Sequence, residues 1–464
     1  MELVLKNHRF IFHNRNKMWS KVLNFTPQMQ CKHFRISTRY CTRPLAGILT
    51  RSKNYSTQMP EEAKEYTLFK HLTAKIKACG PITVADYMKE VLTHPTAGYY
   101  MNRDVFGQHG DFITSPEISQ LFGEMIGIWI VNELSKITED SFQLVELGPG
   151  RGTLCKDILR VLKRLKLIHR ASIHLVEISP ALSKIQSEKL CVSSKECPQA
   201  VSKKDNSVSH YREGLTEEGI KVFWYSSIKD IPKKFSVFVA HEFFDALPIH
   251  KFQKTGDIWN EVLIDIDPKT ENEKKFRYVL TKRATPASAI FVSRDEKRDH
   301  VEVSPQTIVI IDYMASFLEE FGGFALIADY GHNGEKTDTF RSFRRHEQYD
   351  PLMEPGTADL TADVDFSLID RVGRKESRLI SFGPMDQCSF LKNLGIDVRL
   401  EMLLKNASDE ERSHIESGYH MIMDEDKMGT RFKVFSFFPS VLEAYLAQWP
   451  VAGFSNPQQE ASKK

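Results

Sequence analysis

Apolar and polar positions alternate along this chain in two different rhythms, which predict buried strands and amphipathic helices in turn. In residues 155–167, for example, Ile158, Leu159, Leu162 and Leu165 recur at helical spacing. Strands alternating with helices predict a mostly parallel sheet that binds ligands at the carboxyl ends of its strands. The predicted strands are 145–147, 173–177, 221–225, 236–240, 323–328 and 432–438, and the helices 155–167, 306–321 and 385–394.

The region before this sheet has a different pattern. Residues 62–78, 83–92 and 117–134 read as helices. Residues 93–100 and 110–117 are rich in glycine and aromatic side chains and cannot form a regular helix, so they predict an ordered surface loop or a lid. We therefore expect a helical and lid region over residues 60–135.

Two segments interrupt the predicted sheet domain, which we place at residues 136–440. Residues 193–219 are polar and without period, which predicts an exposed insertion. Residues 249–300 contain short alternating strands at 258–266 and 275–280 and predict a β-rich insertion. Residues 441–464 are left as a C-terminal tail.

The most informative motif lies between the first strand and its helix. Gly148, Gly150 and Gly152 form a turn that can bend sharply and approach a ligand without Cβ contacts. A dinucleotide fingerprint would place its third glycine at Thr153, and Glu146 is an awkward neighbour for a pyrophosphate. S-adenosylmethionine, which is cationic and lacks phosphate, suits this turn better.

A second acid supports a bound nucleoside. Glu177 ends the next predicted strand, where a carboxylate holds ribose hydroxyls in Rossmann-like sites. The alternative reading is a glycine turn that only joins strand to helix. With Glu146 and Glu177 in place, we predict an α/β, Rossmann-like fold that binds S-adenosylmethionine.

Candidate acceptor residues follow the strand 236–240. Glu242 and Asp245 lie three apart, so their carboxylates would share one face if a helical turn starts there. Paired carboxylates suit a guanidinium, which is planar, always charged and donates in a fork. The alternative is capping of a helix N-terminus. Asp329, Asp359 and Asp363 are further acids that equally fit turn-forming roles.

Charge and composition narrow the function further. Residues 1–47 carry nine Lys or Arg against the single acid Glu2. This composition is typical of a mitochondrial transit peptide, which we place at residues 1–46. A basic arm that binds nucleic acid is the alternative. Without those residues the net charge of +2 becomes −6, which argues against nucleic acid and mildly favours a cationic partner. No apolar run is long enough to cross a bilayer, and the cysteines show no metal-binding spacing, so we expect no membrane segment and no metal.

Together these motifs resemble the mitochondrial complex I assembly methyltransferases related to the slime-mould protein MidA. The resemblance spans nearly all of the chain after residue 47 and is carried by 93–100, 110–117, 146–152, 242–248, 328–331 and 359–366. It implies a protein arginine methyltransferase of the mitochondrial matrix that symmetrically dimethylates an arginine of a complex I core subunit and supports assembly of the complex.

The resemblance also assigns roles to residues. It implies Glu242 and Asp245 as the acceptor-binding, catalytic acids. Members of the family often carry Asn before this Glu, where the chain has His241, so acceptor geometry is open at that point. The cofactor-binding residues that we expect are Thr114, Ser115, Glu146, Gly148, Gly150, Gly152 and Glu177.

Two other functions stay open at this point. A small-molecule or quinone methyltransferase would need a closed apolar acceptor pocket, which the acidic segments do not favour. A cofactor-binding assembly chaperone without catalysis would use the long insertions for docking.

Overall fold

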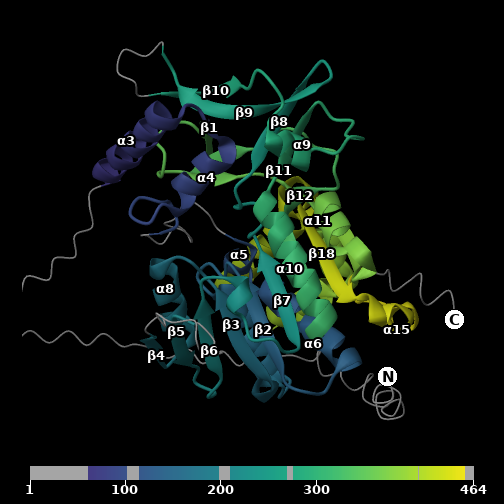
Figure 1. Ribbon diagram of the computed structural model, residues 1–464. Helices are drawn as coiled ribbons and strands as arrows, with labels where there is room; N and C mark the ends of the chain where they lie inside the picture. The colour runs from purple at the N-terminus through teal and green to yellow at the C-terminus, as the bar shows by residue number, and fades with distance from the viewer. Residues whose placement is uncertain (1–60, 102–113, 198–209, 269–274, 406, 455–464) are drawn as a thin grey trace, which may run out of the picture.

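A twisted sheet with helices on both faces forms the centre of the molecule (Figure 1). The computed structural model describes residues 61–101, 114–197, 210–268, 275–405 and 407–454. The predicted transit peptide and part of the predicted lid, residues 110–113, lie outside these ranges. The strand order is β17-β18-β12-β7-β2-β3-β6-β5-β4. The α/β, Rossmann-like class expected from the sequence is confirmed.

Five parallel strands make the middle of this sheet, and antiparallel strands extend both edges. β6, β3, β2, β7 and β12 run parallel, β18 is antiparallel to β12, and β17 is antiparallel to β18. At the other edge β5 and β4 add antiparallel strands. Because the chain leaves β2 toward β3 on one side and reaches β7 on the other, the strand order reverses at β2, where α/β sheets bind ligands. The strands are β2 (Phe142–Leu147), β3 (Ala171–Val176), β4 (Ser193–Glu196), β5 (Arg212–Leu215), β6 (Lys221–Tyr225), β7 (Ser236–His241), β12 (Gly323–His332), β17 (Leu379–Asp386) and β18 (Phe432–Pro439).

Two hydrophobic layers hold the helices to this sheet. One layer packs α6, α7 and the C-terminal helices against one face and includes the fully buried Trp129 and Trp224. The other packs α10 and α11 against the opposite face. The central strands are buried on both faces, which explains their nearly continuous apolar runs. The helices of this part are α5 (Ser115–Ile118), α6 (Gln120–Ile137), α7 (Thr153–Arg164), α8 (Pro180–Leu190), α10 (Pro305–Phe321), α11 (Phe366–Gly373) and α12 (Gln387–Asn393).

A second, smaller sheet covers the ligand edge. β9 pairs with β1, β8 and β10, and β8 pairs with β11, so the expected β-rich insertion is joined by a strand from the N-terminal region. α3 and α4 lie against it (Figure 1). These elements are α3 (Glu61–Cys79), β1 (Ile82–Thr83), α4 (Val84–Thr93), β8 (His250–Thr255), β9 (Ile258–Ile266), β10 (Phe276–Leu280), α9 (Pro286–Phe291) and β11 (His300–Val303).

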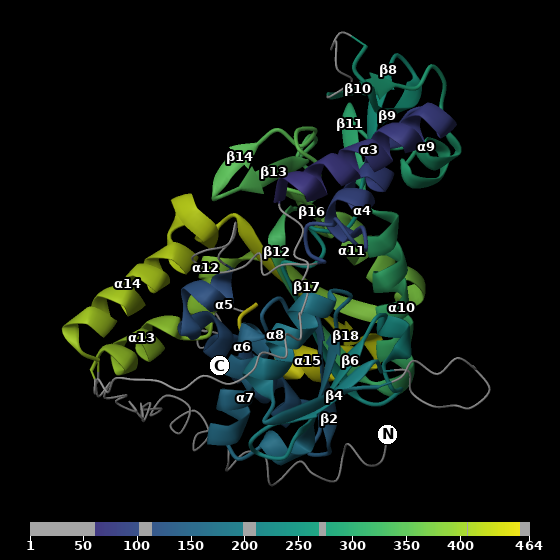
Figure 2. The same ribbon diagram turned by 90° about the vertical axis from the view of Figure 1, so that its left-hand side faces the viewer.

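Two groups of short elements flank the same edge. Figure 2 shows α13 and α14 projecting together from one side of the molecule, and β13 and β14 above them. These elements are β13 (Arg341–Arg344), β14 (Glu347–Tyr349), β15 (Asp359–Thr361), β16 (Val364–Asp365), α13 (Ile396–Leu404), α14 (Asp409–Met423), the π-turn η4 (Glu425–Gly429) and α15 (Glu443–Gln448).

Several segments differ from the sequence-based expectations. The segment expected to be an irregular insertion contains β4 and β5, because edge strands need no buried apolar face and so lack a visible period. The segment expected to be a tail packs on the core up to residue 454: Trp129 Nε1 donates to the Ala452 carbonyl at 2.9 Å, and Val451 is buried. Among the helices of the described ranges, none combines the length and apolarity that crossing a membrane requires.

Candidate active site

A cavity of about 1780 Å³ opens at the carboxyl ends of the parallel strands. Its wall includes the loops after β2, β3, β6 and β7, the strand β15, and residues of α14 and η4. The sheet edge that the strand order singles out is therefore hollow. Among the predicted site residues, Gly148, Gly150, Glu177, Glu242 and Asp245 line this cavity.

The glycine turn after β2 needs glycine at each of its three positions. Gly148, Gly150 and Gly152 have φ values of 61°, 51° and 77°, in the left-handed region that side chains disfavour. A Cβ on Gly148 would also lie 2.7 Å from Cδ2 of Phe243, which itself lines the cavity. The turn is thus shaped by backbone freedom and by close approach to the loop after β7.

Glu177 and Gln186 tie this turn to the next strand. Gln186 Nε2 donates to the Gly150 carbonyl at 2.7 Å and to Glu177 Oε2 at 2.9 Å, while its Oε1 accepts from Trp224 Nε1 at 2.9 Å. Glu177 Oε1 accepts the Ser179 amide at 2.7 Å. Burial raises the pKa of Glu177 to about 7, and these hydrogen bonds oppose the rise. The carboxylate is held in place with lone pairs left for a ligand.

Two predicted cofactor residues lie behind the cavity wall. Glu146 is buried and does not line the cavity; the Cys155 amide hydrogen-bonds its carboxyl at the start of α7, and burial raises its pKa to about 8. Gly152 is the N-cap of α7. Both positions organise the turn from behind, so direct contact with a cofactor stays a prediction for them.

Thr114 and Ser115 lie where the described part resumes after residue 113, as the N-cap and the first residue of α5. Ser115 is buried, and its backbone amide hydrogen-bonds the Glu242 carboxyl. Their neighbours Pro116 and Glu117 line the cavity, whereas neither Thr114 nor Ser115 does. Their expected role in cofactor binding also stays a prediction.

No helix follows β7; residues 242–247 form a turn that Asp329 holds together. Asp329, on β12, is fully buried, and its Oδ2 accepts the amides of Phe243 at 3.1 Å, Phe244 at 2.9 Å and Asp245 at 3.4 Å. Glu242 has a φ of 48°, a strained value for a residue with a side chain. The helix-capping alternative for Glu242 and Asp245 therefore has no helix to cap, and Asp329 takes the turn-forming role considered for it.

The turn brings two unsatisfied acids to the cavity. Asp245 Oδ2 accepts from Thr361 Oγ1 at 2.7 Å, but within the described residues neither Asp245 Oδ1 nor Glu242 Oε1 has a hydrogen-bond partner, although both atoms are buried. Burial raises the pKa of Glu242 well above its ordinary value, and the negative charge of Asp245 adds to the rise. Burial likewise raises the pKa of Asp245. Buried polar atoms without a partner are rare in proteins, and these two oxygens can accept hydrogen bonds from a ligand in the cavity.

The acids of the segment 359–365 divide into three roles. Asp359 lines the cavity, and its Oδ1 accepts from the Tyr100 hydroxyl at 2.7 Å. Asp363 is paired with Lys336 and with Arg341, and these cations lower its pKa against the effect of burial. Asp365 caps α11. Asp359 therefore adds a further acid to the cavity wall that holds Glu242 and Asp245.

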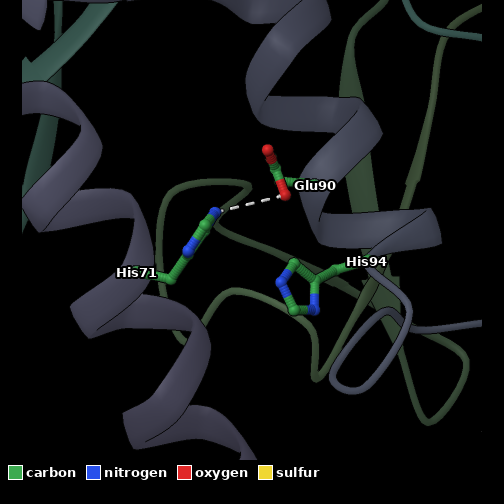
Figure 3. Close-up of side chains that lie close together, drawn as sticks. All are labelled: His71, Glu90 and His94. Atoms are coloured by element: carbon green, nitrogen blue, oxygen red, sulfur yellow. Dashed lines mark ion pairs between the residues drawn. The ribbon is translucent and has the colours of Figure 1, made fainter.

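Outside the cavity, His71, Glu90 and His94 lie together between α3 and α4 (Figure 3). His71 Nε2 is 3.5 Å from Glu90 Oε2, and Lys75 Nζ is 3.0 Å from Glu90 Oε1. The acid already has a lysine partner, so we interpret this group as an ion-pair cluster that holds α3 on α4. His94 Nδ1 is within 3.3 Å of Thr96 Oγ1, in keeping with a structural histidine.

Comparison with known proteins decides what kind of site this is. Residues 125–385 match the family of S-adenosyl-L-methionine-dependent methyltransferases. The protein arginine methyltransferase NDUFAF7 homolog of Drosophila melanogaster, a mitochondrial protein, is 50% identical over 397 residues, which cover 85% of this chain and 90% of that protein. The chain belongs to the NDUFAF7 family of protein arginine methyltransferases. The human member is 49% identical over 403 residues, 86% of this chain and 89% of the human protein.

Family membership confirms the expected enzyme class and its cofactor. The protein is an S-adenosylmethionine-dependent methyltransferase, and its relatives are named as mitochondrial proteins. Among solved structures, a Burkholderia thailandensis protein bound to S-adenosyl-homocysteine has the same fold, with a TM-score of 0.65, 24% identity, and coverage of 83% of this chain and 96% of that one. The donor set here fits such a cofactor, because a Cβ-free turn and a held carboxylate meet at one cavity.

Several contacts within the site could not be assigned from the sequence. Gln186 lies nine positions after Glu177, and Asp329 acts on a turn more than eighty residues earlier. Tyr100, in the segment 93–100 expected to form a surface loop or a lid, also donates its hydroxyl hydrogen to Asp359. The strand-end position of Asp329 was the only signal that pointed to any of these roles.

Proposed function

We propose that this enzyme transfers methyl groups to an arginine of a mitochondrial complex I core subunit, symmetrically and in the matrix, and so supports assembly of that complex. The observation that carries the proposal is the pair of buried carboxyl oxygens, Glu242 Oε1 and Asp245 Oδ1, which lack donors at the cavity. A guanidinium offers the donors and the charge that these oxygens lack.

The electrostatics of the pair favour a cation over a neutral acceptor. Alone, Glu242 and Asp245 have raised pKa values because burial disfavours two neighbouring negative charges. An arginine side chain between them would lower both pKa values and bind as an ion pair with two acids. Asp359 adds a third acid to the same wall. A neutral acceptor in an apolar pocket would gain nothing from these groups.

The residues for the cofactor lie at the other side of the cavity. Gly148, Gly150 and Glu177 would hold S-adenosylmethionine, with Ile178 and Ile228 as apolar wall near the ribose acid. When bound, this cofactor would supply a methyl group activated by its sulfonium: the acceptor nitrogen would bond to the methyl carbon as the carbon–sulfur bond breaks, and S-adenosyl-homocysteine would leave. The protein's part is to align the guanidinium and exclude water, effects that together can supply roughly 7 to 11 kcal/mol.

The acids also accept the proton that methylation releases. A guanidinium nitrogen loses a proton as its bond to the methyl carbon forms, and Glu242 or Asp245 is placed to take it. With the arginine bound both acids would be ionised carboxylates, so either can act as the general base. Full deprotonation of the arginine beforehand is not required.

A labelling experiment tests the proposal. The purified chain is incubated with methyl-labelled S-adenosylmethionine and recombinant complex I core subunits, and the label is located by mass spectrometry. We expect label on one arginine of one core subunit, as symmetric dimethylarginine. Glu242→Gln should bind S-adenosyl-homocysteine normally yet turn over about 100-fold more slowly or worse, since it loses a charged hydrogen bond to the guanidinium. Glu320→Gln, the same change at an exposed acid of α10, should behave as wild type.

Other outcomes would replace the proposal. Label on a small molecule and on no arginine would identify a small-molecule methyltransferase. Cofactor binding without any methyl transfer would identify an assembly chaperone. Loss of both cofactor binding and turnover in Glu242→Gln would assign that residue a structural role.

A further inference from the structure

The last residue of β7, His241, carries a buried imidazole that the acceptor chemistry described so far does not use. Its side chain is only 6% exposed. The ring stacks on Phe432, with centroids 5.9 Å apart and planes 11° apart, and contacts Phe122 at 4.9 Å. These two aromatic rings fix the plane and position of the imidazole.

The imidazole faces the first of the two acceptor acids. His241 Nε2 lies 3.6 Å from Glu242 Oε1, and within the described residues neither atom has a hydrogen-bond partner. The distance is a few tenths of an ångström beyond a hydrogen bond. Two buried polar atoms left apart each carry a desolvation penalty that a small movement toward each other would remove.

Packing alone does not explain an imidazole here. A phenylalanine would fill the space between Phe122 and Phe432 without burying ring nitrogens. The imidazole faces Glu242 Oε1, the oxygen of this carboxyl that lacks a donor. The same carboxyl accepts a hydrogen bond from the backbone amide of Ser115, at the start of α5.

We propose that His241 is a positioning residue, whose Nε2–H donates to Glu242 Oε1 when the arginine substrate ionises that acid, and so orients the carboxylate toward the guanidinium. The proposal rests on the proposed function, because Glu242 takes its acceptor role from there. Burial disfavours the imidazolium, so the group acts as a neutral hydrogen-bond donor and transfers no proton itself.

Nuclear magnetic resonance tests the contact without any methyl transfer. In the full chain labelled with ¹⁵N-histidine, the His241 signals are assigned by their absence from His241→Phe or, should that variant fail to fold, from His241→Gln. At a pH high enough to ionise Glu242 in the free chain, we expect Glu242→Gln to shift the Nε2 signal of His241. The signals of His174, a buried imidazole bonded to Ser172 and Tyr225, should stay in place. Unchanged His241 signals in Glu242→Gln would overturn the proposal.

Kinetic measurements test whether His241 affects methyl transfer. The substrate is the core subunit that receives the label in the experiment described above. His241→Phe should lower kcat about 10-fold, the effect of one hydrogen bond to a charged group, and leave the affinity for S-adenosyl-homocysteine within about twofold. His241→Gln, which keeps a donor, should restore kcat to within about threefold of wild type. In a Glu242→Gln background, His241→Phe should cost less than about twofold, because its effect passes through Glu242.

The outcomes separate the two proposals. An unchanged kcat in His241→Phe, or the same loss in the Glu242→Gln background, overturns the positioning role. If the wild-type chain methylates no arginine, the proposed function fails, whereas the resonance experiment still decides whether His241 and Glu242 interact.

Discussion

Replacing Gly148 by alanine should damage the cofactor site in a way that can be separated from simple loss of stability. Gly148 has a φ of 61°, and a Cβ there would lie 2.7 Å from Cδ2 of Phe243. The left-handed backbone costs an alanine about 1–2 kcal/mol. Relief of the contact requires Phe243 to move, and such overpacking costs about 1–3 kcal/mol more.

Gly256→Ala is the matched control for this change. Gly256 has the same φ of 61° in the exposed turn between β8 and β9, but a Cβ there would meet nothing within 4 Å. Both variants carry the backbone penalty, and only Gly148→Ala carries the contact with Phe243. The difference between their free energies of unfolding, measured by urea titration, should therefore be about 1–3 kcal/mol.

Calorimetry with S-adenosyl-homocysteine measures the functional part. We expect Gly148→Ala to weaken binding at least about 10-fold, equal to about 1.4 kcal/mol, because Phe243 borders the cavity beside the turn. Gly256→Ala should bind within about twofold of wild type. A folded Gly148→Ala protein with wild-type affinity would refute the reasoning and remove Gly148 from the site.

Three further predictions concern the buried acids. Burial raises the pKa values of Glu242 and Asp245, and both acids must ionise to hold a guanidinium. The KM for the protein substrate should therefore fall as pH rises, and a KM independent of pH would contradict this. Glu146 has a pKa of about 8 when folded against about 4.5 unfolded, so its contribution to stability is complete below pH 4.5 and is lost as pH rises to 8. In Glu146→Gln the fall of unfolding free energy over that window should be less steep by up to about 1.4 kcal/mol per pH unit, and an unchanged slope in urea titrations would argue against a protonated Glu146. Asp329→Ala leaves three turn amides without their acceptor and should lower the unfolding free energy by about 3 kcal/mol. Asp329→Asn keeps an acceptor oxygen and should lower it by less than about 1 kcal/mol. Equal losses in the two variants would mean that Asp329 does not hold the turn through its acceptor oxygen.

The glycine turn and the ends of the central strands were predictable because their signals are local. Left-handed glycines, an amphipathic helix and a strand that ends on an acid occupy consecutive positions from residue 145 to Glu177. The same holds for Glu242 and Asp245, which follow a buried strand directly. Parallel-sheet geometry then places all of these at one edge without further information.

Interactions between distant parts of the chain were not predictable. The spacing of Glu242 and Asp245 suggested a helical turn, but Asp329, from another strand, holds those residues in a non-helical turn instead. The side chain of Glu146 does not line the cavity, and its carboxyl accepts the Cys155 amide at the start of α7. The helix α14 and the segment η4 border the cavity although no local motif marks them as part of a site.

The most direct test of the central claim is a crystal structure of this chain with S-adenosyl-homocysteine. We predict that the ligand occupies the glycine turn, its ribose on Glu177 and its sulfur directed at Glu242 and Asp245. A ligand bound elsewhere, or one whose sulfur faces away from these two acids, would contradict the assignment of the methyl donor and acceptor sites.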